Sequence, residues 1–244
     1  MEFAIVFLAG IGAGVVNTAV GAGSLITYPA LLLAGLPPVV ANVTNTVGLT
    51  PGSVAGTWAY RSELRSQKRL IVLLLPVAAL GAVAGAALLL TLPSETFKFV
   101  VPILIIAAAC LVGLQPLLAK SNSEVRPHHL ALAVSVTGAS VYGGYFSAAQ
   151  GIILLGFLGI FHKGGIQTQN ALKNLLQTAV NIVAAVFFLI TSQVDFRHVL
   201  CVAAGSLLGA PLGAWLARRI PQLLFRAIVT VFGLAVGILL IIRG

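Results

Sequence analysis

The chain has 244 residues, of which 59% are hydrophobic and 8% are charged, and its mean hydropathy is +1.08. Soluble domains carry about 25% charged residues, so this composition excludes a soluble protein and indicates helices that cross a lipid bilayer. The basic residues behind the net charge of +9 are scattered singly, which argues against nucleic-acid binding. Retention of lysine and arginine in cytoplasmic loops explains the excess, and attraction of an anionic substrate is a secondary explanation.

Ten apolar segments follow one another along the chain. Six reach the length of about 20 residues that a helix needs to cross hydrocarbon: 39–60, 70–90, 97–118, 166–191, 198–217 and 222–242. The other four form two pairs, 3–20 with 25–34 and 129–148 with 151–161, and each pair is too short for two full crossings. We predict that each pair is a short hairpin that turns within the membrane. The N-terminus lacks the basic residues of a signal peptide, so none is expected.

The two halves of the chain resemble each other, which predicts an internal repeat. The matches, at offsets of 129 or 128 residues, are Gly35 with Gly164, Asn45 with Asn174, and the run 80–86 with 208–214. We therefore expect an all-α membrane protein built from two repeats, each a broken-helix hairpin plus three long helices. The first repeat covers residues 1–120, a cytoplasmic linker covers 121–128, and the second repeat covers 129–244.

Charge predicts the orientation of these repeats. The loop at 61–69 is rich in arginine and lysine and should be cytoplasmic, whereas its counterpart at 192–197 should face outward. Because equivalent loops then fall on opposite faces, the two repeats should have inverted topology. Both termini should lie outside.

Glycine-rich interruptions break both hairpins and are the first candidates for a binding site. They comprise Gly21, Ala22, Gly23 and Ser24 in the first half, and Gln150 and Gly151 in the second. A helix that begins at mid-membrane presents unpaired N–H groups and a partial positive charge, which suit an oxyanion. We therefore expect free amides at 23–25 and 149–151. The alternative is that small residues only let helices pack closely, and we prefer it for Gly81, Gly85, Gly209 and Gly213.

Polar residues deep in two long segments are further candidates. Asn45 and Asn174 either line the site or join helices through hydrogen bonds. Lys173 lies about 10 Å into its helix, where a lysine must either snorkel toward the cytoplasmic face or meet an anion. Tyr28 and Tyr60 are interpreted as interfacial anchors.

The segment VGAGSLITYPALLLAGLPPVVANVTNTVG at 20–48, followed by GTWAYR at 56–61, resembles the first repeat of the TauE/SafE sulfite exporter family. The segment 150–181, which contains NALKN, resembles the second repeat. The resemblance covers nearly the whole chain. It implies a prokaryotic permease of the cytoplasmic membrane that exports or takes up a small sulfur-containing anion, such as sulfite or an organosulfonate.

The sequence offers no catalytic or cofactor-binding pattern. All five carboxylates fall in loops or at segment ends, so an intramembrane carboxylate relay has no candidate. Cys110 and Cys201 lie in apolar segments, and no metalloprotease or nucleophile motif is present. We expect no enzyme, no cofactor, no metal and no disulfide. Coupling could use the substrate's own proton, a lysine or a sodium ion, and uncoupled flow is equally open.

These observations together predict a transporter that moves a small anion by alternating access. The predicted substrate-binding residues are Gly21, Ala22, Gly23, Ser24, Asn45, Gln150, Gly151, Lys173 and Asn174. A passive anion channel built from the same hairpins is the alternative, and saturable flux would distinguish the carrier from it. The expected partners are the anion and the lipid bilayer, and the small-residue faces are compatible with a homo-oligomer.

Overall fold

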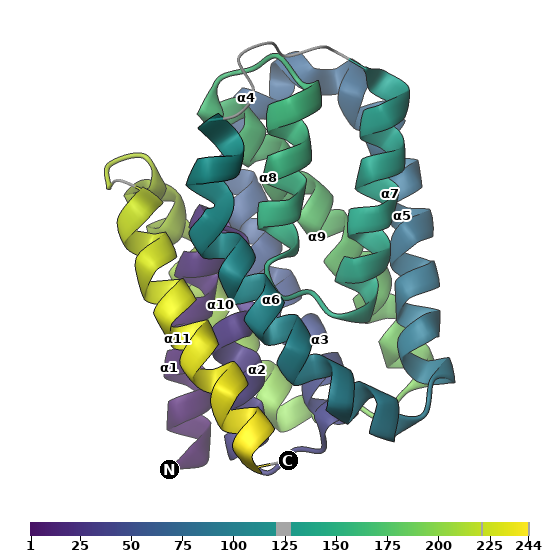
Figure 1. The fold of residues 1–244 in the computed structure, drawn as a ribbon, viewed down its shortest axis with the longest axis vertical. Coiled ribbons are helices and arrows are strands. Elements are labelled where there is room, and N and C mark those ends of the chain that lie inside the picture. The colour runs from purple at the N-terminus through teal and green to yellow at the C-terminus, as the bar shows by residue number, and fades with distance from the viewer. Residues whose placement is uncertain (121–127, 221, 244) are drawn as a thin grey trace.

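The computed structural model describes residues 1–120, 128–220 and 222–243, and within them it contains helices and no strand (Figure 1). The elements are α1 (Glu2–Ala19), α2 (Ser24–Leu33), α3 (Pro38–Ala59), α4 (Arg61–Leu64), a 3₁₀ turn (Arg65–Gln67), α5 (Lys68–Thr91), α6 (Ser94–Lys120), α7 (His129–Tyr145), α8 (Gln150–Phe161), α9 (Ile166–Thr191), α10 (Phe196–Ala217) and α11 (Gln222–Arg243). The all-α prediction is confirmed, and each predicted segment corresponds to one helix. The predicted linker, apart from His128, lies outside the described residues.

Five helical stretches are long and apolar enough to cross a membrane: α1, Arg61–Thr91, Ser94–Leu114, α9 and α10. α2 and α8 are shorter, as predicted for hairpin arms, and α11 is apolar over Ala227–Ile242. α3 has 22 residues but does not qualify, because Asn and Thr side chains occupy its buried face. α1, in contrast, is long enough by itself, which the hairpin prediction did not anticipate. The polarity of α3 places hydrogen-bonding groups at the centre of the protein.

The two halves pack against each other in a reciprocal pattern. α1 lies along α10, and its counterpart α7 lies along α5, which is the counterpart of α10 (Figure 1). α3 packs against its own counterpart α9, and α6 packs against α11. A two-fold relation between the halves would produce this exchange of partners.

Small residues allow the paired helices to approach closely. A Cβ added at Gly85 on α5 would overlap the backbone oxygen of Val141 on α7, and one added at Gly213 on α10 would overlap α1 in the same way. Gly81 and Gly209 make the equivalent approaches one turn earlier. The packing interpretation of these four glycines is therefore confirmed.

Hydrogen bonds across the crossing of α3 and α9 follow the repeat. The Thr50 hydroxyl donates to the carbonyl oxygen of Asn181 (3.4 Å), and the Thr178 hydroxyl donates to that of Ser53 (2.8 Å). Adding 128 converts the donor Thr50 into the donor Thr178, and the acceptor Ser53 into the acceptor Asn181, so the two hydrogen bonds are equivalent by the repeat. The earlier residue of α3 (Thr50) meets the later residue of α9 (Asn181), and the later one (Ser53) meets the earlier one (Thr178), so α3 and α9 run antiparallel.

This register corrects one predicted equivalence. α3 begins at Pro38, three residues after Gly35, whereas α9 begins at Ile166, two residues after Gly164. The shorter loop shifts the offset from 129 to 128, so the counterpart of Asn45 is Lys173. The predicted pairing of Asn45 with Asn174 is therefore wrong, because it extended the loop register into the helix.

Two of the basic loops meet at one end of the molecule. The guanidinium of Arg218, which follows α10, lies 2.7 Å from the Glu63 carboxylate on α4 and 5.0 Å from the centre of the Tyr60 ring. The same guanidinium also donates to the carbonyl of Ala59 at 3.1 Å. The loop at 61–69, predicted from charge to be cytoplasmic, thus lies beside the basic residues that follow α10, at the end of the molecule near α4 in Figure 1. Tyr60 is fully buried there, so its interpretation as an interfacial anchor is wrong.

The close approach of α5 and α7 predicts a specific sensitivity. We expect Gly85→Ala to lower the stability by about 1–3 kcal/mol, because the added methyl overfills a packed interface. Gly138→Ala on α7 is the matched control, since a Cβ there meets nothing within 4 Å. Thermal unfolding of both purified variants in detergent measures the difference. Equal melting temperatures would contradict the packing described for this interface.

Candidate functional site

The two broken hairpins meet tip to tip inside the protein. The first tip joins α1 to α2 and contains Gly21 with φ +85°, and the second joins α7 to α8 and contains Ala149 with φ +57°. The amide of Gly151 donates to the carbonyl of Gly21 at 3.1 Å. A Cβ added at Gly21 would overlap Gly151 Cα, so glycine is required by both backbone conformation and space.

Several amides expected to be free are used within the protein. The Gly23 amide donates to the side-chain oxygen of Asn17 (3.3 Å), and the Leu25 amide donates to the carbonyl of Ala22 (3.2 Å). In the second tip, the backbone amide of Gln150 donates to the carbonyl of Ser147 (3.4 Å), and the backbone amide of Gly151 donates to the carbonyl of Gly21 in the first tip. The expectation of free donors is therefore wrong for these amides, because a buried backbone amide finds a partner wherever the chain provides one.

A cluster of short polar side chains connects the first tip to α3 and to the second tip. The hydroxyl oxygens of Ser24 and Ser147 lie 2.7 Å apart, and the Asn45 amide donates to Ser24 at 2.9 Å. The Thr27 hydroxyl donates to the side-chain oxygen of Asn45. Asn45 thus joins helices by hydrogen bonds, as one of its two interpretations required. Ser147 was not predicted, because nothing in its local sequence distinguishes it from a loop serine.

Lys173 is held at the end of α1. Its ammonium donates to the carbonyls of Asn17 (3.2 Å) and Thr18 (2.9 Å), and the neighbouring Asn174 amide also donates to Thr18 (3.2 Å). Carbonyls of the last helical turn lack intrahelical partners and carry partial negative charge, so a cation there is stabilising. The side chain is 0% exposed, which excludes snorkelling.

The second tip lies directly against this lysine. A Cβ added at Gly151 would lie 2.9 Å from Lys173 Cδ and 2.9 Å from Gln177 Oε1. The structure therefore brings Gly21, Gly151, Lys173 and Asn174 into one group. Ser24 and Asn45 belong to the adjoining cluster of short polar side chains. The side chain of Ala22 is fully buried and apolar. All nine predicted residues belong to the hairpin tips and the helices that cross them.

A second polar network continues along α9. The Gln177 amide donates to the Asn17 side-chain oxygen (2.8 Å), and the amides of Asn17 (3.3 Å) and Asn181 (2.9 Å) both donate to the Ser53 hydroxyl. The polar residues on this face of α9 are Asn170, Lys173, Asn174, Gln177 and Asn181. Their spacing of three and four residues marks one helix face, and that periodicity could have identified Gln177 and Asn181 in the sequence.

Several buried side-chain amides in this region have no hydrogen-bond partner among the residues that the structure describes. Both polar atoms of Gln150 and Asn170 are unpaired, as are Gln177 Oε1 and Asn181 Oδ1. The side-chain amide of Gln150 lies against Gly143, and a side chain at position 143 would overlap this amide. Buried polar groups are normally paired, so this region has spare capacity to bind a polar ligand or water.

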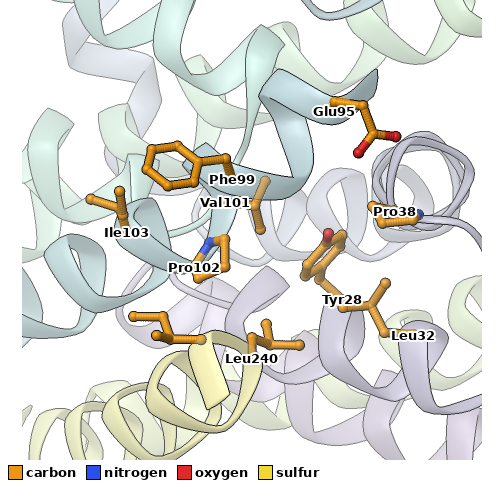
Figure 2. A pocket seen from close by; sticks show the side chains of 10 residues that line it. Tyr28, Leu32, Pro38, Glu95, Phe99, Val101, Pro102, Ile103 and Leu240 are labelled. Atoms are coloured by element: carbon orange, nitrogen blue, oxygen red, sulfur yellow. The ribbon is translucent and has the colours of Figure 1, made fainter. Parts of the chain in front are cut away.

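An apolar cavity of about 620 Å³ lies on the other side of the first hairpin, between α2, α3, α6 and α11 (Figure 2). Its wall includes Tyr28, whose ring packs edge-on against Phe146 at 5.3 Å and against Phe97 at 6.5 Å. Phe146 belongs to the second tip, so these rings join the cavity wall to that tip. The lining is apolar apart from Tyr28 and Glu95 and offers little to an anion. Tyr28 is almost fully buried, so its interpretation as an interfacial anchor is wrong.

Within the described residues, no group of three or more His, Cys, Asp or Glu side chains could hold a metal ion. The arrangement at the hairpin tips is instead one buried ammonium surrounded by neutral amides, hydroxyls and backbone groups. Such a site can bind and orient a small polar or anionic molecule. It offers no described carboxylate to take up a proton from one.

Comparisons with known proteins are consistent with this arrangement. The profile described as "Sulfite exporter TauE/SafE" matches residues 6–240. A probable membrane transporter protein of Sinorhizobium sp is 30% identical over 98% of this chain and 92% of its own length. A probable membrane transporter protein of Haemophilus influenzae is 28% identical over 93% and 90%, and YfcA of Escherichia coli K12, with the same description, is 26% identical over 93% and 85%. No solved structure gives a significant match.

The tip contact predicts how two similar glycines differ. Gly21 and Gly35 both have positive φ, so alanine at either should cost about 1–2 kcal/mol in backbone strain. Only Gly21→Ala also forces the tips apart, because a Cβ at Gly35 meets nothing within 4 Å. We expect a larger loss of thermal stability for Gly21→Ala in detergent. If Gly35→Ala proved equally damaging, the tips would not be held in contact as described.

Proposed function

The chain belongs to the TauE/SafE sulfite exporter family and is a multi-pass membrane transporter, and from this we propose that it carries a small sulfur-containing anion across the cytoplasmic membrane. Sulfite and organosulfonates are the substrates proposed, and alternating access of two inverted repeats is the mechanism. The binding residues proposed are Gly21, Ala22, Gly23, Ser24, Asn45, Gln150, Gly151, Lys173 and Asn174. No enzymatic role is proposed.

The observation that carries the proposal is the complete burial of the Lys173 amino group. The carboxylates in the described residues are Glu2, Glu63, Glu95 and Asp195, and each lies at or beside a helix end. The ammonium contacts only backbone carbonyls, whose partial charges do not neutralise a full positive charge. Burying an ion without a counter-ion is costly. An anionic substrate supplies the counter-ion that the protein lacks at this position.

The arrangement of the halves supports alternating access. The helices of one half pair with their counterparts or with exchanged partners in the other half, and α3 and α9 run antiparallel. α6 and α11 also run antiparallel, since Gly113 faces Thr230 and Gly237 faces Ile106. Inverted repeats of this kind place a substrate at their interface and expose it to either side by rocking. The two hairpin tips lie at that interface.

Flux into proteoliposomes tests the proposed substrate class. We expect saturable uptake of labelled sulfite or a small organosulfonate by the purified protein. Lys173→Ala should reduce the flux about 10-fold or more, corresponding to a loss of about 1.4 kcal/mol of binding, and Ser24→Leu should reduce it by blocking the tip. Lys163→Ala, at an exposed position outside the site, is the control and should retain full flux.

The outcomes of this experiment separate three cases. Non-saturating flux would indicate a passive anion channel. Absence of flux for sulfite, thiosulfate, sulfate and an organosulfonate alike, with a folded and monodisperse protein, would rule out the sulfur-anion assignment. Full flux in Lys173→Ala would remove the lysine from the binding site while leaving the transporter class intact.

Cysteine accessibility tests the inverted topology. In a variant without Cys110 and Cys201, a cysteine at Ser66 should react with a membrane-impermeant maleimide only after cells are permeabilised. A cysteine at Ser192, in the counterpart loop, should react in intact cells. The physical reason is that basic loops are retained in the cytoplasm. Labelling of both positions from the same side would contradict the inverted arrangement.

A further inference from the structure

We propose that the site at the hairpin tips selects anions of single negative charge, such as sulfonates and hydrogensulfite, and discriminates against divalent anions such as sulfate. This inference rests on the proposed function and adds a rule for its substrate: the charge of the anion, before its shape, decides whether it binds.

Lys173 supplies the whole formal charge of the site. It is the only ionisable side chain on α3, α8 and α9, the helices that surround the tips together with α1, α2 and α7. On α1, α2 and α7, the ionisable side chains are two residues in first helical turns far from the tips, Glu2 and His129, and three tyrosines, Tyr28, Tyr142 and Tyr145. Tyrosines are neutral near pH 7. The helices around the tips therefore bring one formal positive charge to the site and no negative charge to balance it.

The helix ends at the tips do not alter this count. α1 and α7 end there, and α2 and α8 begin there. A helix C-terminus contributes about half a negative charge and an N-terminus about half a positive charge, so the four contributions cancel. The partial charge of the end of α1 is directed at the lysine, which its carbonyls already hold.

The other groups near the tips can orient an anion without adding charge. Gln150 is fully buried, and its side-chain amide nitrogen, a donor, has no partner in the described part of the chain. Asn174 and Ser24 are also buried and neutral. A monovalent anion beside Lys173 leaves the interior neutral, whereas a divalent anion leaves a net negative charge in a region of low dielectric. Leaving a buried charge uncompensated is unfavourable, so a preference of about 100-fold or more for the monovalent anion is expected.

Competition for flux measures this preference. Proteoliposomes containing the full chain take up a labelled organosulfonate, and unlabelled methanesulfonate and sulfate compete as tetrahedral anions of similar size and different charge. We expect methanesulfonate to compete at a concentration about 100-fold lower than sulfate. Lys173→Arg retains the single charge and should retain the order. Asn174→Lys adds a second charge and should shift the order toward sulfate.

Each outcome bears on one claim. Equal or better competition by sulfate in the unmodified protein would overturn the charge rule, and the proposed transport of sulfur anions would stand. Lack of uptake of every anion would instead contradict the proposed function itself. The comparison in the unmodified protein decides the matter even where Asn174→Lys does not fold, and a folded Asn174→Lys with an unchanged order would also overturn the rule.

Discussion

The structure depends on one constraint: a helix that ends inside a membrane protein leaves carbonyl groups that water cannot reach. α1 and α7 both end in this way. At the end of α1 the free carbonyls accept hydrogen bonds from Lys173 and Asn174 of α9, and at the end of α7 the carbonyl of Tyr145 accepts one from Asn42 of α3 at 2.9 Å. Each broken helix is thus completed by the long helix of the other half. Neither half could bury its own hairpin without the other.

The same contacts connect stability with binding. The ammonium of Lys173 serves the protein by holding the end of α1, and the proposed function assigns it a second partner in the anion. An anion that draws the ammonium toward itself weakens its hold on Asn17 and Thr18. Under the proposed function, the substrate and the first hairpin would share the Lys173 amino group, so binding of the anion would alter the hydrogen bonds at the end of α1.

The positions of the helices follow from the sequence because glycine, proline and polar breaks interrupt otherwise continuous apolar runs. The glycines of the LGAVAGA and LGAPLGA runs could be assigned to packing for the same reason: spacing fixes the helix face. The partners of the tip amides were missed because they depend on the local conformation of each tip: Asn17 is six residues from Gly23, and the carbonyl of Ser147 accepts from the backbone amide of Gln150 within one turn. The burial of Tyr28 and Tyr60 was missed because an aromatic residue near a segment end looks the same in a sequence whether it faces lipid headgroups or protein. The fold was thus more predictable than the site.

The repeat is symmetric in its packing but not in its chemistry. In the register set by the α3–α9 crossing, the counterpart of Lys173 is Asn45, which is neutral. Two identical halves would give an inward-open and an outward-open state of equal free energy, and the empty carrier would divide itself evenly between them. A single charge on one side of such a carrier would remove that degeneracy. Under the proposed mechanism, the difference between Lys173 and Asn45 would therefore give the empty transporter a resting side.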